Sequence, residues 1–183
     1  MKKWLKITLI ILAIIIIILV SLFGALLFDI TSYGATGAQT LNPTGTPIGR
    51  ALVVYDPGFS GAASSDATKI ADDLQANKYT VILAGVHNGA AGNTSGYNLI
   101  VTGGPMYWGQ VSSSIDGFIK TIPDNVKLGV FGSTGSSNYV ESDFTSLQKQ
   151  VASATNDQSV TVKLILNGNE TNDCAELVSA LIK

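Results

Sequence analysis

The sequence predicts an α/β sandwich, in which helices cover both faces of a parallel sheet, preceded by one membrane-spanning helix. Two observations lead to this fold class. Five short apolar runs lack the alternation of a half-solvated sheet, and segments with helical period lie between most of them. An uncharged stretch of 22 residues, from Ile7 to Phe28, precedes them and is long enough to cross a bilayer.

The N-terminal segment, residues 1–28, is predicted to be a cytoplasmic N-terminus followed by a transmembrane anchor. As a helix, residues 7–28 would rise about 33 Å, close to the hydrocarbon thickness of about 30 Å. A cleaved signal peptide is the alternative, but its apolar region usually runs only about 7 to 15 residues. Because Lys2, Lys3 and Lys6 precede the stretch, the positive-inside rule predicts a single-pass protein whose folded domain is extracytoplasmic.

Residues 29–49 are rich in Thr, Gly and Pro without an apolar period, so they are predicted to be a flexible tether. The folded domain is then residues 50–183. After the anchor and Asp29, the chain holds eight Lys or Arg residues against twelve Asp or Glu residues, which argues against a nucleic-acid partner. Cys174 is the only cysteine, so an intramolecular disulfide is excluded and a buried, inert thiol is expected.

The elements of the domain follow in order from its apolar pattern. The predicted strands are ALVVY (51–55), YTVILA (79–84), NLIVTG (98–103), KLGVFG (127–132) and VTVKLIL (160–166). Helical periods cover 67–74, 111–122, 144–151 and 174–182. Three of these helices are predicted to start at cap-like pairs: Ser65-Asp66, Ser142-Asp143 and Asn172-Asp173. The connection after the second strand, GVHNGAAGNTSG, is too rich in Gly and Asn for a helix.

Three glycine-rich loops follow strands and are expected to meet at the carboxyl edge of the sheet, where ligands of such folds bind. The first, 56–65, combines glycines and serines with a helix start, which suits a phosphate. A turn that needs glycine for geometry alone is the alternative. Asp56 at its beginning would repel a phosphate unless its carboxylate points away or caps a turn.

The other two loops carry aromatic residues. The loop 104–110 places Tyr107 beside Trp108, and an exposed aromatic pair at this edge suits stacking on a flat heterocycle. Packing of both rings beneath the loop is the alternative. The loop 132–139 adds backbone amides, small side chains and Tyr139. The combination predicts a site for a mononucleotide with a large heterocycle, of which FMN is the simplest.

With these motifs, residues 50–183 resemble the flavodoxin family. Gly103 to Gly109 reproduces the pattern Gly-x-Pro-x-Tyr-x-Gly that often ends the third strand of flavodoxin-like proteins. Gly58 to Ala63 falls on the phosphate-loop pattern Thr/Ser-x-Thr-Gly-x-Thr, where only Ser60 and Gly61 match. The resemblance implies a flavodoxin-like three-layer sandwich with a five-stranded parallel sheet of order 2-1-3-4-5, FMN as the cofactor and electron transfer as the function.

The predicted cofactor-binding residues divide by the part of FMN that they would hold. The phosphate group would bind at Ser60, Gly61, Ser64 and Ser65. The ring system would contact Gly104, Pro105, Met106, Tyr107, Trp108, Gly109, Gly132, Ser133, Thr134, Gly135 and Tyr139. No catalytic residue or metal ligand is predicted, and His87, the only histidine, is expected to be a solvated loop residue.

Two functions stay open at this point. The first is a membrane-tethered electron carrier, or an FMN-dependent oxidoreductase, whose redox partner is a protein or a quinone. The second is an anchored binding or structural module of the same fold without a flavin. It draws on Ala62 and Ala63, which lack the hydroxyl groups of the family pattern, and on Asp56.

Overall fold

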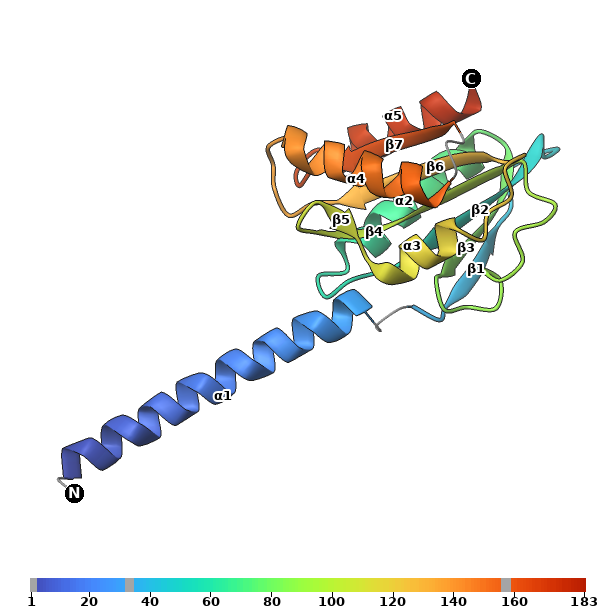
Figure 1. Cartoon of the computed structure of the whole chain (residues 1–183). Helices are drawn as coiled ribbons and strands as arrows, with labels where there is room; N and C mark the ends of the chain where they lie inside the picture. The colour runs from blue at the N-terminus through green and yellow to red at the C-terminus, as the bar shows by residue number, and fades with distance from the viewer. Residues whose placement is uncertain (1–2, 32–34, 156–158) are drawn as a thin grey trace.

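The first helix extends away from the rest of the chain. A computed structural model describes residues 3–31, 35–155 and 159–183, so Lys2 and residues 32–34 of the predicted tether lie outside the described residues. Helix α1 (Lys3–Thr31) projects from the domain as a single rod (Figure 1). Its segment 6–26 is long and apolar enough to cross a membrane.

The rest of the described chain is built around one twisted sheet. Its strands are β1 (Ala38–Leu41), β2 (Gly49–Tyr55), β3 (Tyr79–Gly85), β4 (Leu99–Tyr107), β5 (Gln110–Val111), β6 (Lys127–Ser133) and β7 (Val160–Ile165). The order across the sheet is β1-β3-β2-β4-β6-β7, with β5 paired to β4. The pairs β3·β2, β2·β4, β4·β6 and β6·β7 are parallel, so these strands end at the same edge.

The five predicted strands are parallel to one another, but the prediction that they form the whole sheet is wrong because two antiparallel strands join it. β1 pairs with β3, placing Ala38 opposite Ala84, and β5 folds back on the end of β4. β1 lies within the predicted tether 29–49, which is therefore partly sheet. Its sequence, AQTL, gave no signal because three of its four side chains are exposed.

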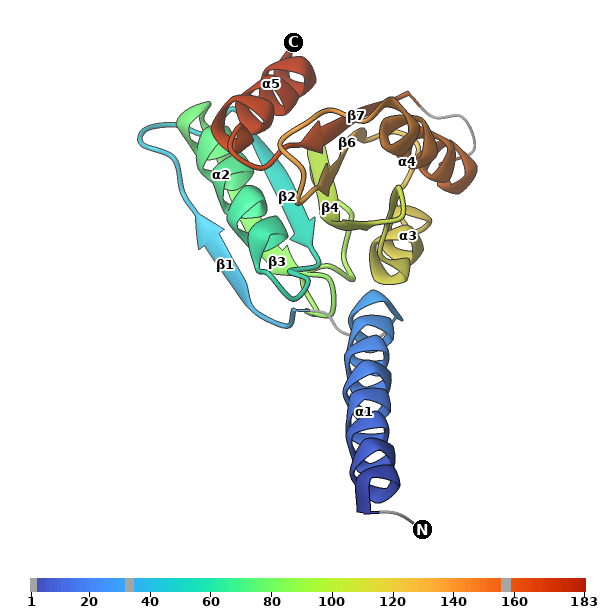
Figure 2. The same ribbon diagram turned by 90° about the vertical axis from the view of Figure 1, so that its left-hand side faces the viewer.

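Helices cover both faces of the sheet, as the continuous apolar strands require. They are α2 (Ala62–Ala76), α3 (Ser113–Ile119), α4 (Glu141–Ala154) and α5 (Glu170–Ile182). Figure 2 shows α2 and α5 on one face and α3 and α4 on the other. Successive residues of β2 divide between the two layers: Val53 packs under α2 and α5, whereas Leu52 packs under α3 and α4. The connection from β3 to β4 contains turns and no helix, as predicted.

The predicted helix starts are wrong. α2 begins at Ala62, α4 at Glu141 and α5 at Glu170, so each helix starts before the pair that was expected to cap it. Asp66 and Asp173 are buried and accept hydrogen bonds from other elements. α3 is shorter than its predicted range 111–122, because Val111 belongs to β5 and the helix ends at Ile119.

Gly103→Ala is expected to destabilise the domain by about 1 to 3 kcal/mol or more, the usual cost of overpacking a core. A Cβ at Gly103 would lie 2.2 Å from the Phe131 carbonyl oxygen in the paired central strand. Gly117→Ala in α3 is the control, since nothing lies within 4 Å of its added Cβ. Urea unfolding of the full chain in mild detergent, monitored by circular dichroism, measures the free energy of unfolding of both variants. Equal stability of the two variants would contradict this account of the β4–β6 contact.

Candidate functional site

The carboxyl ends of the parallel strands surround a cavity of about 410 Å³. All three loops singled out by sequence contribute to it, together with the start of α5. Such a volume lies within the usual range of small-molecule sites, about 300 to 1,000 Å³. Seven of the predicted residues line it: Ser60, Pro105, Met106, Tyr107, Ser133, Thr134 and Gly135.

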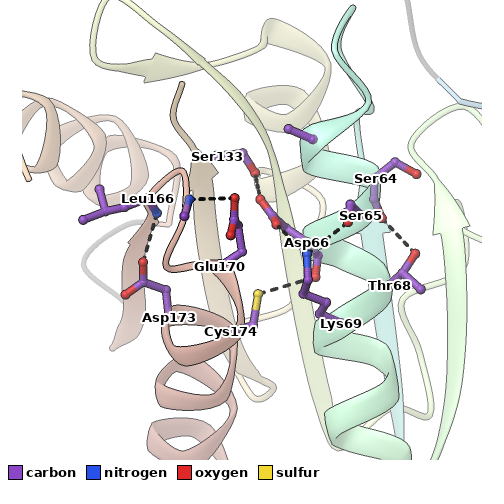
Figure 3. Close-up of polar contacts among 12 residues, drawn as sticks. Ser64, Ser65, Asp66, Thr68, Lys69, Ser133, Leu166, Glu170, Asp173 and Cys174 are labelled. Atoms are coloured by element: carbon purple, nitrogen blue, oxygen red, sulfur yellow. Dashed lines mark hydrogen bonds and ion pairs between the residues drawn. The ribbon is translucent and has the colours of Figure 1, made fainter. Parts of the chain in front are cut away.

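The predicted phosphate residues beyond Ser60 lie at the start of α2, outside the lining. Gly61 is the residue before the helix and has a φ of +70°, which lets the chain turn sharply into α2. The Ser64 carbonyl accepts a hydrogen bond from Thr68 Oγ1, and Ser65 Oγ accepts one from Lys69 Nζ at 3.0 Å (Figure 3). These two serines therefore belong to the helix surface and not to the cavity wall.

Trp108 is exposed at the tip of a hairpin. Trp108 and Gly109 form a two-residue loop between Tyr107 and Gln110, with φ of +50° and +79°. Positive φ at both positions is typical of a type I′ turn, which usually carries Asn-Gly. Trp108 is 76% exposed and does not line the cavity.

The remaining predicted residues also lie outside the lining. Tyr139 is exposed and packs against Phe144, with ring centroids 5.8 Å apart. Gly104 and Gly132 permit close packing of the sheet. A Cβ at Gly104 would lie 3.1 Å from Asp56 Cβ, and one at Gly132 would lie 2.4 Å from Met106 Sδ.

Asp56 is buried and does not line the cavity. Its Oδ2 accepts a hydrogen bond from Ser112 Oγ at 2.6 Å, and its Oδ1 accepts one from the Gly58 backbone N–H at 3.3 Å. The carboxylate thus caps the turn after β2 and joins it to the start of α3. The repulsion expected between Asp56 and a bound phosphate is reduced by this placement.

Two other carboxyl groups line the cavity, and sequence reasoning missed both. Asp66 Oδ2 accepts a hydrogen bond of 2.6 Å from Ser133 Oγ, which links α2 to the end of β6 (Figure 3). Glu170 lies in the first turn of α5, where its Oε1 accepts the Gly168 backbone N–H at 2.9 Å. Asp66 had the sequence signature of a helix start, whereas its partner Ser133 lies 67 residues away.

The two carboxyl groups differ in acidity. Burial raises the pKa of Asp66 above its usual value, although the Ser133 hydrogen bond and Lys69, whose Nζ lies 3.7 Å from Asp66 Oδ1, act in the opposite direction. Hydrogen bonds from the backbone of Gly168 and of Glu170 itself lower the pKa of Glu170. Glu170 is therefore the more persistent negative charge of the cavity.

Cys174 packs beneath this cluster. Its thiol is fully buried and lies 3.7 Å from the Asp66 carbonyl oxygen (Figure 3). Burial, with the nearby Asp66, raises the pKa of the thiol to about 12. The prediction of a buried thiol is confirmed, and a group of this pKa is not a nucleophile near neutral pH.

The cavity suits one part of a mononucleotide better than the other. Tyr107 and Gly135 line the cavity and offer contacts for a flat ring, whereas the Met106 side chain packs into the layer under α3 and α4. Ser60 and the N-terminus of α2 offer hydrogen-bond donors for an anion. Asp66 and Glu170 oppose an anion in the same space. The residues that line the cavity therefore fit the ring of a flavin, and they form a weakened site for its phosphate group.

Asp66→Asn is expected to stabilise the domain above about pH 4, and the gain should grow as the pH rises. A raised pKa means that the folded state holds the Asp66 proton more tightly than the unfolded state, whose value is near 3.8, so ionisation opposes folding. Each pKa unit of difference corresponds to about 1.4 kcal/mol. Urea unfolding of the full chain between pH 3 and 8 measures the gain. A gain independent of pH would contradict this explanation.

Comparisons with known proteins give the fold. No protein-family model matches the chain, and no curated protein matches its sequence. Among solved structures, a flavodoxin from the domain Archaea is similar over 73% of this chain and 99% of its own, with a TM-score of 0.55 and 15% identity. Flavodoxin 2 of Bacillus cereus is similar over 73% of this chain and 97% of its own, with a TM-score of 0.51 and 18% identity.

An NADH:FMN oxidoreductase in its apo form is also similar, over 72% of this chain and 88% of its own, with a TM-score of 0.54 and 11% identity. Identities at this level establish architecture and not activity. The domain that follows α1 has a flavodoxin-like α/β fold.

Proposed function

We propose that this protein is a membrane-anchored flavin-binding module that carries electrons at the membrane. The observation that supports it most directly is the cavity at the carboxyl edge of a flavodoxin-like fold, between the three loops that the sequence singled out. The neighbouring folds named above include two flavodoxins and an NADH:FMN oxidoreductase. FMN is the cofactor proposed for the cavity.

The proposed binding mode follows the cavity lining. Pro105 and Tyr107 would contact the ring from the end of β4, and Thr134 and Gly135 from the loop after β6. Ser60 and the N-terminus of α2 would hold the phosphate group. The flavin supplies the redox chemistry when it is bound, and the chain sets its environment through these contacts.

The anchor decides where this chemistry would take place. Residues 6–26 of α1 would span the bilayer, with the basic N-terminus in the cytoplasm and the domain on the other side. The electron partner would then be a protein or a quinone at the membrane. Electron carriage itself needs no acid or base from the protein.

A second function has its own support. Asp66 and Glu170 line the cavity, and Ala62 offers no hydroxyl group where the flavodoxin pattern has polar residues. An anchored module of the same fold without a flavin would tolerate these carboxyl groups. A measurement of flavin binding distinguishes the two functions, because only the first requires a bound flavin.

Flavin titration of the full chain in mild detergent is expected to show saturable one-to-one binding with quenched flavin fluorescence. Tyr107→Ala should weaken the quenching because this ring lines the cavity. Trp108→Ala is the control, since its indole lies outside the lining and should leave the affinity unchanged. A protein that quenches neither FMN nor riboflavin at saturating concentration would favour the module without a flavin.

Asp66→Asn is expected to tighten FMN binding by roughly tenfold, or about 1.4 kcal/mol, by removing a carboxyl group from the cavity that receives the phosphate. Riboflavin, which lacks the phosphate, should bind both proteins about equally. Asp72→Asn lies on the same helix but outside the cavity and serves as the matched control. Equal tightening of FMN and riboflavin would mean that Asp66 acts on the fold and not on the phosphate.

A further inference from the structure

The chain enters the folded domain at the carboxyl edge of the sheet. Because β1 runs antiparallel to β3, with Ala38 opposite Ala84, the residues before β1 lie beside the end of β3. The Gly85 N–H donates to the Gly37 carbonyl at 2.8 Å, and the His87 N–H donates to the Ala35 carbonyl at 2.9 Å. A Cβ at Gly85 would lie 2.2 Å from the Ala35 oxygen, so this entry segment is closely packed.

The end of α1 is held close to the same edge. The helix ends at Thr31, and Ala35 is already hydrogen-bonded to the domain. Four peptide steps span at most about 14 Å. Figure 1 shows α1 leaving the domain on the side where β5 lies, and Figures 1 and 2 both place the end of α1 next to α3. A membrane crossed by α1 would therefore lie near the carboxyl edge.

Exposed apolar side chains gather at this edge. Outside α1, five large apolar residues are exposed in the described part of the chain: Ile48, Phe59, Trp108, Tyr139 and Val140. The last four lie in the loops after β2, β4 and β6, which end at the carboxyl edge. Ile48 precedes β2 and bonds to the residue before β3, so it lies at the opposite edge.

The exposed position of Trp108 requires an unfavourable backbone conformation. A residue with a side chain in the left-handed region costs about 1 to 2 kcal/mol, and here that residue holds a largely exposed indole. A strained backbone that exposes a large ring indicates that the ring has a binding surface outside the domain. The amphipathic indole of Trp is typical of the interface between membrane and water.

The charged residues of the carboxyl edge indicate how this edge would bind to a membrane. The loops 56–61, 108–112, 134–140 and 166–169 contain no Lys or Arg. Attraction to anionic headgroups requires basic residues, so electrostatics would not hold this edge on a membrane. Its aromatic side chains and the short connection to α1 are the features that would do so.

We propose that the carboxyl edge of the domain rests on the bilayer, with Phe59 and Trp108 in the interfacial layer and the cavity opening toward the lipid. The proposal rests on the membrane anchoring of the proposed function and is independent of flavin binding. Phe59 lines the cavity and is 61% exposed, so it connects the cavity to this surface.

The test uses proteins with one tryptophan each, which is possible because the chain has only Trp4 and Trp108. Trp4→Phe leaves Trp108 as the reporter, and Trp108→Phe leaves Trp4, near the start of α1. Ile48→Trp, combined with both replacements, places the reporter at the opposite edge. The length of β2, about 20 Å, separates the two edges.

Each full-length protein is reconstituted in phosphatidylcholine vesicles whose acyl chains are brominated near the headgroup, and tryptophan quenching is measured. The Trp4→Phe protein is expected to be quenched several-fold more strongly than the Ile48→Trp protein. Adding phosphatidylglycerol should leave both values unchanged. Circular dichroism checks that each variant is folded.

Three results would overturn the proposal. If Trp108 is quenched no more than the tryptophan introduced by Ile48→Trp, the edge does not face the bilayer, although the anchor stands. If quenching of Trp108 requires phosphatidylglycerol, charge holds the edge and not its aromatic rings. If the Trp108→Phe protein shows no quenching of Trp4, α1 is not inserted, and the anchoring fails together with this proposal.

Discussion

The burial of both faces of one sheet is the constraint on which the rest of the structure depends. Strands that are apolar along their whole length, such as Ala51 to Val54, must be covered on both sides. Parallel strands joined by helices satisfy this requirement, and they also bring the ends of β2, β4, β6 and β7 to one edge. Because these strands end at the same edge, the three loops that follow them meet there and surround the cavity. Antiparallel β1 then delivers the incoming chain to the same edge.

The polar interactions beneath the cavity serve first to hold its walls together. Asp66 joins α2 to the end of β6 through Ser133, and Asp56 joins the first loop to the start of α3 through Ser112. Buried carboxyl groups of this kind cost free energy unless they are hydrogen-bonded. Asp66 and Glu170 line the cavity and give it an acidic character, whereas Asp56 lies outside the lining. The fold therefore favours a flavin in the cavity, whereas the carboxyl groups of the cavity oppose its phosphate group.

Most of the fold could be predicted from the sequence, because burial on two faces leaves a continuous apolar signature in each parallel strand. The antiparallel strands left no such signature: β1 is mostly exposed, and β5 has only two residues. The location of the cavity could also be predicted, from glycine-rich loops after strands. The identity of its charged residues could not, because Asp66 looks like a helix cap until Ser133, distant in sequence, is placed beside it. The exposure of Trp108 was predicted, but its place outside the cavity was not, because that place depends on a turn that usually selects asparagine.

Cys174 has a consequence for the compartment in which the domain can fold. With a pKa of about 12 and no solvent contact, the thiol stays protonated and unreactive in oxidising and reducing surroundings alike. The folded domain therefore needs neither an oxidant to mature nor a reductant to protect it.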